Sequence, residues 1–186
     1  SLNAVSMLAE AEVQGMKLQM VSIQAKPNKQ VTMMMMMGNT MMKMVFDGEN
    51  GSISQQGVNS QIPEKDALVM SNTTLPIEEI GWLDDENVKF SSTEELDDRI
   101  LNVLEINKQT YVAYDSETGL KVKETQFVDM PDGSILPQTT FFDDYKPVNG
   151  ILFPHVIKSP IGPQSLEFKI INITVNPEVS ESDFSI

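Results

Sequence analysis

The chain has 186 residues, a formal net charge of −14 and no cysteine. This length suits one domain that buries its core without cross-links, and the lack of cysteine excludes disulfides and thiolate chemistry. The excess of acidic residues makes nucleic acids and anionic lipid surfaces unfavourable partners, because phosphate binding needs clustered Lys and Arg.

The first part of the chain is predicted to form strands, because apolar and polar residues alternate between turn signals. The predicted strands are 5–13, 16–23, 30–37, 40–46 and 52–56. Gln14-Gly15, Pro27-Asn28 and Gly38-Asn39 separate the first four, since Gly and Asn tolerate left-handed backbone geometry and Pro donates no ladder hydrogen bond.

The pattern then changes to a helical insert at about 62–86. Residues 63–70 begin with proline and carry acids in the first turn, as helix N-termini do, and residues 76–83 predict a second helix broken by Gly81. Strands resume after Asn87. The predicted ones are 88–92, 100–106, 110–115, 121–129, 138–145, 151–157 and 166–175, with turn signals that include Pro131-Asp132-Gly133 and residues 160–163.

This order of elements predicts a mainly β fold with a small α component. About eleven strands in sequence favour a large curved antiparallel sheet, which at this length curls or partly closes. One face needs a cover, and the insert around Trp82 is the expected one. We expect a single domain over residues 1–186.

The segment 31–51 contains eight methionines, five of them consecutive at 33–37. No apolar run approaches the roughly 20 residues that span a bilayer. Core packing and the wall of an apolar pocket both stay open, because methionine is flexible and adapts to varied apolar partners. Soft-metal binding is disfavoured, since consecutive strand residues point to opposite faces.

If the segment lines a pocket, the lining combines one face of the methionine run with nearby apolar residues. Which face points inward cannot be read from the pattern, and we favour the face of Met33, Met35 and Met37. The full candidate set is Met20, Met33, Met35, Met37, Met42, Met44, Phe46 and Trp82.

No catalytic set is recognisable in the chain. His155 is the only histidine, so the paired histidines of a zinc peptidase are missing. No serine stands in a Gly-x-Ser-x-Gly pattern, and no glycine-rich phosphate loop precedes a helix. We therefore expect a non-enzymatic chain without a metal or other cofactor, in which His155 is a half-buried strand residue.

Three segments, MVFDGENGSIS, YVAYDSETGLKVKETQ and FDDYKPVNGILFP, carry a family resemblance. They resemble the LolA/LolB-like superfamily of periplasmic lipoprotein carriers, which includes outer-membrane lipoprotein-sorting proteins. The likeness is greatest to the LolA-like module at the C-terminal end of insulinase-type (pitrilysin) zinc peptidases. The motifs shared with that module are Asp144-Tyr145-Lys146, Gly150-Ile151, Phe153-Pro154 and Gly162-Pro163-Gln164.

The resemblance implies a curved antiparallel half-open barrel of about eleven strands, with helices closing its mouth. It also implies a location in the periplasm or cell envelope of a Gram-negative bacterium. The family's leading helix has no counterpart before Val5, and the arginine that ties lid to sheet has no match in Arg99. The abrupt start indicates a domain excised from a longer chain.

Two functions follow as hypotheses. The first is a non-catalytic envelope module that binds a hydrophobic ligand, such as a lipid or lipoprotein acyl chain or an apolar peptide, in a cavity between sheet and helices. The alternative is a structural or docking domain of an insulinase-type zinc peptidase, with its partner an N-terminal peptidase domain of the same chain that holds the metal.

Overall fold

A computed structural model of the protein describes residues 1–73, 76–130, 132–161 and 164–186. The turn signals predicted at Pro131 and at Gly162-Pro163 lie outside the described residues. The described chain forms two compact units. The first comprises Ser1–Gly81, Pro147–Phe153 and Lys169–Ile186, and the second comprises Trp82–Lys146 and Pro154–Phe168.

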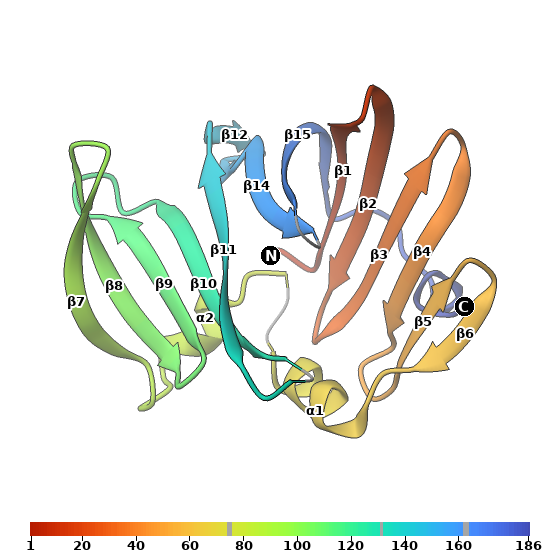
Figure 1. The fold of residues 1–186 in the computed structure, drawn as a ribbon, viewed down its shortest axis with the longest axis horizontal. Coiled ribbons are helices and arrows are strands. Elements are labelled where there is room, and N and C mark those ends of the chain that lie inside the picture. Colours follow the sequence, from red (N-terminus) through yellow and green to blue (C-terminus); the bar gives the residue numbers. More distant parts are fainter. Residues whose placement is uncertain (74–75, 131, 162–163) are drawn as a thin grey trace. The chain divides into compact units, whose positions relative to one another are not determined.

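The first unit contains antiparallel strands in the hydrogen-bonded order β6-β5-β4-β3-β2-β1-β15 (Figure 1). Their bounds are β1 (Ala4–Val13), β2 (Met16–Ala25), β3 (Lys29–Met36), β4 (Asn39–Phe46), β5 (Gly51–Gln55), β6 (Val58–Gln61) and β15 (Gln164–Val175), of which residues 169–175 belong to this unit. The helix α1 (Glu64–Asn72) and the 3-10 helix η1 (Glu181–Phe184) also lie here, and the short helix α2 (Glu79–Trp82) ends in the second unit.

The second unit continues from the first five residues of β15, in the order β15-β14-β11-β10-β9-β8-β7 (Figure 1). The bounds are β7 (Lys89–Leu96), β8 (Arg99–Asn107), β9 (Thr110–Asp115), β10 (Lys121–Asp129), β11 (Ile135–Asp143) and β14 (Val156–Ile161). A separate two-stranded ladder joins β12 (Lys146–Val148) to β13 (Ile151–Phe153), and its residues 147–153 belong to the first unit. Among the described strands, β6 and β7 are the first and last in the hydrogen-bonded order.

These strands confirm the predicted mainly β, antiparallel fold class. Their bounds differ from the predicted ones where the sequence signal is weak. The exposed strand β6 and the short β12 were not predicted, because neither carries an apolar alternation. The predicted strand 151–157 is in fact interrupted, and His155 lies between β13 and β14. Its backbone N–H donates to the carbonyls of Asp143 and Asp144, at 3.0 and 3.1 Å.

Three hairpins of the first unit share one kind of turn. Gln14-Gly15, Met37-Gly38 and Gln56-Gly57 have positive φ at both residues, as a type I′ turn requires. The hairpin predicted at Gly38-Asn39 therefore lies one residue earlier, and Met37 is a turn residue with φ of 51° rather than the last residue of a strand. Its side chain is 78% exposed.

The strands of the first unit bury side chains on both faces of the sheet. On one face Phe46 is fully buried, and Ile62 at the start of the helical insert lies over Gly51 of the same cross-strand row. On the other face Phe184 of η1 packs against a cluster of small and branched residues. Those residues are Ala4, Ala25, Val31 and Val45, with Ile23 beside them.

The helical insert is held at its two ends rather than by a buried helical face. Besides the contact of Ile62 with Gly51, the Asn28 side-chain amide donates to the carbonyl of Ser71 at the end of α1, at 2.6 Å. No residue of α1 is buried, and Leu68 and Val69 are mostly exposed. The predicted helices therefore exist, and the insert is attached through Ile62, two residues before α1, and through the Ser71 carbonyl within α1.

Candidate apolar binding surface

Cross-strand pairing aligns methionines on one face of the first unit. Met20, Met34 and Met42 are direct neighbours across β2, β3 and β4. Residues directly opposite each other in an antiparallel pair lie on the same face of the sheet. The cross-strand row on one side of these three residues contains Met36, and the row on the other side contains Met7 and Met44. The row beyond that of Met7 and Met44 contains Phe46. We call this surface the methionine face and define it by Met7, Met20, Met34, Met36, Met42, Met44 and Phe46.

Charge is absent from the methionine face. The charged residues of β1–β4 are Glu10, Glu12, Lys17, Lys29 and Lys43. The strand register places all five on the opposite face, where Lys43 is paired with Met33, and Glu10 is in the row of Gln19 and Met35. The methionine face carries only apolar side chains and the uncharged polar ones of Ser, Thr, Asn and Gln.

The six methionines of this face are half-buried, whereas two residues beside them on the same face are completely buried. These two are Ala9, in the row of Met20, and Phe46. Flexible thioether side chains thus form a partly exposed layer on this face. Such a layer adapts its shape to an apolar partner at little cost, because methionine has several accessible rotamers and a polarisable sulfur.

The structure divides the predicted lining between the two faces. Met20, Met42, Met44 and Phe46 lie together on the methionine face. Met33 and Met35 lie on the opposite, charged face, and Met37 lies in the hairpin turn. Met33 and Met35, which we favoured as lining residues, therefore do not share a face with the other predicted residues of the sheet. Trp82 ends α2 and belongs to the second unit, so its part in a shared lining stays a prediction.

Sequence reasoning missed Met7, Met34 and Met36 as members of this surface. The signal that finds them is the spacing of the charges. In β3, Lys29 is an even number of residues from Met33 and Met35 and an odd number from Met34. In β4, Lys43 is an even number of residues from Met41 and an odd number from Met42. Because side chains alternate between the two faces of a strand, Met34 and Met42 lie on the face without the lysines.

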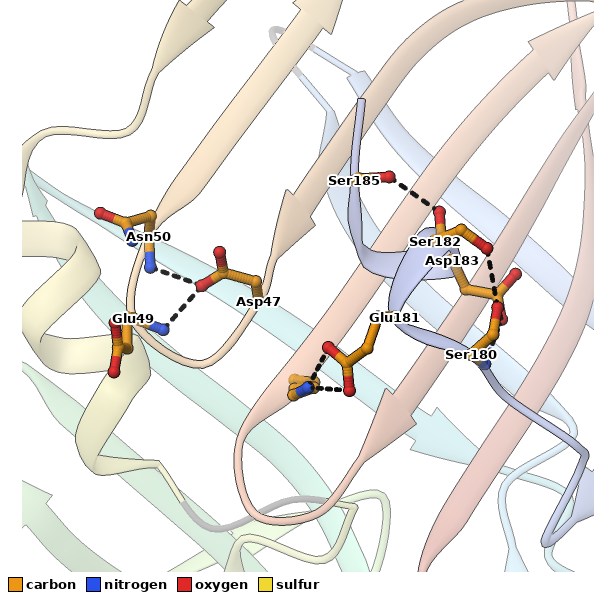
Figure 2. Close-up of polar contacts among 9 residues, drawn as sticks. Asp47, Glu49, Asn50, Ser180, Glu181, Ser182, Asp183 and Ser185 are labelled. Atoms are coloured by element: carbon orange, nitrogen blue, oxygen red, sulfur yellow. Dashed lines mark hydrogen bonds and ion pairs between the residues drawn. The ribbon is translucent and has the colours of Figure 1, made fainter.

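The turn between β4 and β5 and the C-terminal segment form a polar region of the first unit (Figure 2). Asp47 Oδ1 accepts hydrogen bonds from the backbone N–H groups of Glu49 and Asn50, and Figure 2 shows both. The hydrogen bond from Asn50 is the main cause that lowers the pKa of the Asp47 carboxyl. The Glu181 carboxylate pairs with Lys29. An open cavity of about 420 Å³ lies between these groups.

These carboxylates have structural roles. Asp183 accepts a hydrogen bond from the Ser180 backbone N–H, the main cause that lowers its pKa, and the two residues form a capping box at η1. No group of three or more Asp, Glu or His side chains in the described ranges is arranged to hold a metal ion. No helix of the described chain is long and apolar enough to cross a membrane.

The chain is similar to known proteins in its fold rather than in its sequence. No protein-family model matches the chain, and no curated protein sequence matches it. The structure is similar to a LolA superfamily protein from Nitrosomonas europaea, with a TM-score of 0.60 and 11% identity over 100% of this chain and 90% of that one. The fold is LolA-like.

Two further structures have this LolA-like fold in common with the chain. A putative outer membrane lipoprotein-sorting protein domain from Vibrio parahaemolyticus has a TM-score of 0.59 and 12% identity, covering 98% of this chain and 88% of that one. A DUF1329 family protein from Desulfovibrio piger has a TM-score of 0.60 and 11% identity, covering 100% and 90%. These likenesses confirm the predicted LolA-like fold, while the relation to insulinase-type peptidases stays a prediction.

Proposed function

We propose that the chain is a non-catalytic cell-envelope module that binds a hydrophobic ligand on the methionine face. The ligand class is an acyl chain of a lipid or lipoprotein, or an apolar peptide segment. One observation carries the proposal: β1–β4 place every charge on one face and six half-buried methionines on the other. A surface without charge lets an acyl chain bind without stripping water from an ion, which is costly.

The LolA-like fold supports this ligand class and a location in the periplasm or cell envelope of a Gram-negative bacterium. The similar structures include one named for the LolA superfamily and one named for outer-membrane lipoprotein sorting. Each methylene group that an acyl chain buries contributes about 0.8 kcal/mol, so affinity is expected to rise with chain length. An apolar peptide would instead show no such regular increase.

Neighbouring methionines on opposite faces provide a matched test. Met34 is on the methionine face, Met35 follows it on the opposite face, and both are half-buried. We expect Met34→Gln to weaken binding of an uncharged palmitoylated peptide about fivefold to a hundredfold, because a buried amide without a partner costs about 1–3 kcal/mol. Met35→Gln should leave the affinity unchanged. Native mass spectrometry gives the stoichiometry, and titration calorimetry gives the affinity.

Three results would contradict the proposal: no binding of acylated peptides by the parent protein, equal losses in the two variants, or loss in Met35→Gln alone. Absence of binding would favour the alternative, a docking domain of a zinc peptidase that has no ligand of its own. The single-domain organisation over residues 1–186 belongs to the same proposal, and limited proteolysis that leaves the chain intact would support it.

A further inference from the structure

The second unit contains a cavity that is separate from the methionine face. It has a volume of about 320 Å³, at the lower end of the range for small-molecule sites. Its apolar wall comes from the end of β7, from β10, from the end of β11 and from β14. The residues of this wall are Leu96, Val122, Phe141, Phe142 and Val156.

Local irregularities of the strands shape this cavity. Val122 occupies a register shift between β9 and β10, and bulges of this kind turn a side chain away from its regular position. Val122 is almost fully buried, and Phe141 is 38% exposed at the opening. Leu96 and Arg99 flank the tight turn between β7 and β8, which brings an apolar and a cationic side chain together at the cavity.

Arg99 is the only arginine of the chain, and its guanidinium lines the cavity half-buried. In the part of the chain that the structure describes, this guanidinium forms no hydrogen bond and no ion pair within 4 Å. It lies near Asp115, yet the Oδ1 atom of Asp115 already accepts hydrogen bonds from the backbone N–H groups of Glu117 and Thr118. A guanidinium offers five N–H donors, so Arg99 retains the capacity to bind an anion.

The lysines on the same face of the second unit are already paired. Lys158 Nζ lies 3.1 Å from Glu167 Oε2, and Lys123 Nζ lies 2.7 Å from Glu94 Oε1. Two carboxylates, those of Asp97 and Asp143, also line the cavity. They disfavour a ligand with two negative charges, because like charges close together repel each other. One charge on the ligand is therefore the best match for one available guanidinium.

We propose that this cavity binds a monoanionic amphiphile with one short alkyl chain, with its carboxylate on Arg99 and its chain against Leu96, Val122 and Phe141. The guanidinium fork matches a carboxylate in two parallel hydrogen bonds. The alkyl chain packs against the apolar wall, and Lys158 keeps its ion pair with Glu167.

The single arginine provides a direct reporter. Its Nε–H group gives one NMR signal in the whole chain, so any shift of that signal reports on this cavity. We expect octanoate to shift the signal in a saturable way, whereas 1-octanol and octyltrimethylammonium leave it unchanged. Acetate and inorganic phosphate should need at least tenfold higher concentration, because they lack the chain or carry the wrong charge.

Variants separate the charge from the packing. Arg99→Gln should weaken octanoate binding at least tenfold, measured on the backbone amide shifts of β8 and β11, and Arg99→Lys less so, because an ammonium lacks the fork. Lys158→Gln is the matched control at the same cavity and should change the affinity less than threefold. Phe141→Ala should weaken octanoate binding and leave acetate binding unchanged.

The proposal is overturned if octanol shifts the signal as octanoate does, if phosphate binds as tightly as octanoate, or if Arg99→Gln keeps the parent affinity. It does not depend on the methionine face. Met34→Gln should leave the octanoate titration unchanged, so each site can fail while the other holds. Should Arg99→Gln not fold, Arg99→Lys and Phe141→Ala decide the matter, and parent affinity in both would refute the site.

Discussion

The attachment of the C-terminal segment to the first unit can be tested with Phe184→Ala. Phe184 is 4% exposed and packs on a cluster that includes Ala4, Ala25 and Val45. Phe→Ala at a rigid core position typically costs about 3–5 kcal/mol. A chain end can instead detach, which limits the loss to the free energy of docking the segment.

The loss of stability in Phe184→Ala depends on the contacts that still hold the C-terminal segment when the aromatic ring is removed. The other contacts are the ion pair of Lys29 with Glu181, in which Glu181 is 84% exposed, and the hydrogen bond from Lys43 Nζ to the Ser185 carbonyl. Exposed ion pairs contribute about 0–1 kcal/mol each. Ordering the backbone costs about 1–2 kcal/mol for each residue, so these contacts cannot hold the segment alone. We therefore expect the loss to equal the burial of one large side chain, about 2–3 kcal/mol.

The assay is urea unfolding followed by far-UV circular dichroism, with Ile186→Ala as the control because its side chain is 47% exposed. Since Phe184→Ala is expected to release the segment, adding Lys43→Gln should cost almost nothing more. A loss below about 0.5 kcal/mol, the range of surface substitutions, or full additivity of the two changes would refute this reasoning.

Three other predictions test local geometry. In Gly51→Ala the added Cβ would lie 2.5 Å from the Ile62 side chain. Because overpacking costs about 1–3 kcal/mol, we expect a loss of stability of this size in urea unfolding. The double variant Gly51→Ala with Ile62→Ala should recover part of the lost stability. Met37→Asn should stabilise the hairpin by about 0.5–1 kcal/mol, because asparagine tolerates a left-handed conformation at little cost and Met37 has φ of 51°; an unchanged or lower melting temperature would contradict it. The backbone N–H of Thr118 is the main cause that lowers the pKa of Asp115, so this carboxylate stabilises the folded state above its unfolded pKa of about 3.9 and the stabilisation is lost as pH falls through the lower folded pKa. As the pH falls from neutral to about pH 2, the urea midpoint should therefore decline less steeply in Asp115→Asn than in the parent protein. Equal declines would mean that the carboxylate has the same pKa in the folded and unfolded states, and would contradict the prediction.

The fold class was predictable because its signals are local. Alternation of apolar and polar residues marks a strand whatever the strand pairs with, and residue pairs such as Gln14-Gly15 mark turns through their backbone freedom alone. The hairpin at Met37-Gly38 was placed one residue late, because five successive methionines show no alternation and so give no strand end. The edge strand β6 was missed for a related reason, since all four of its residues are exposed.

The candidate surface was predictable only in part. Residue type identified the methionines, and the charges at Lys29 and Lys43 carried the information that separates the two faces. The cavity at Arg99 has no comparable signal. Its residues come from strands far apart in the chain, and a bulge at Val122 shapes its wall.

Residue types and their order along the chain were enough to predict antiparallel strands with a helical insert, to exclude cysteine chemistry and to locate the methionine-rich hairpin. Those properties depend on residue type and on neighbours along the chain. The folded chain was needed to show which methionines share a face, that Ile62 and Phe184 cover opposite faces of the first unit, and that Arg99 lines a cavity without an ion-pair partner among the described residues. Cross-strand register and bulges are set by packing between distant segments, so local preference does not encode them.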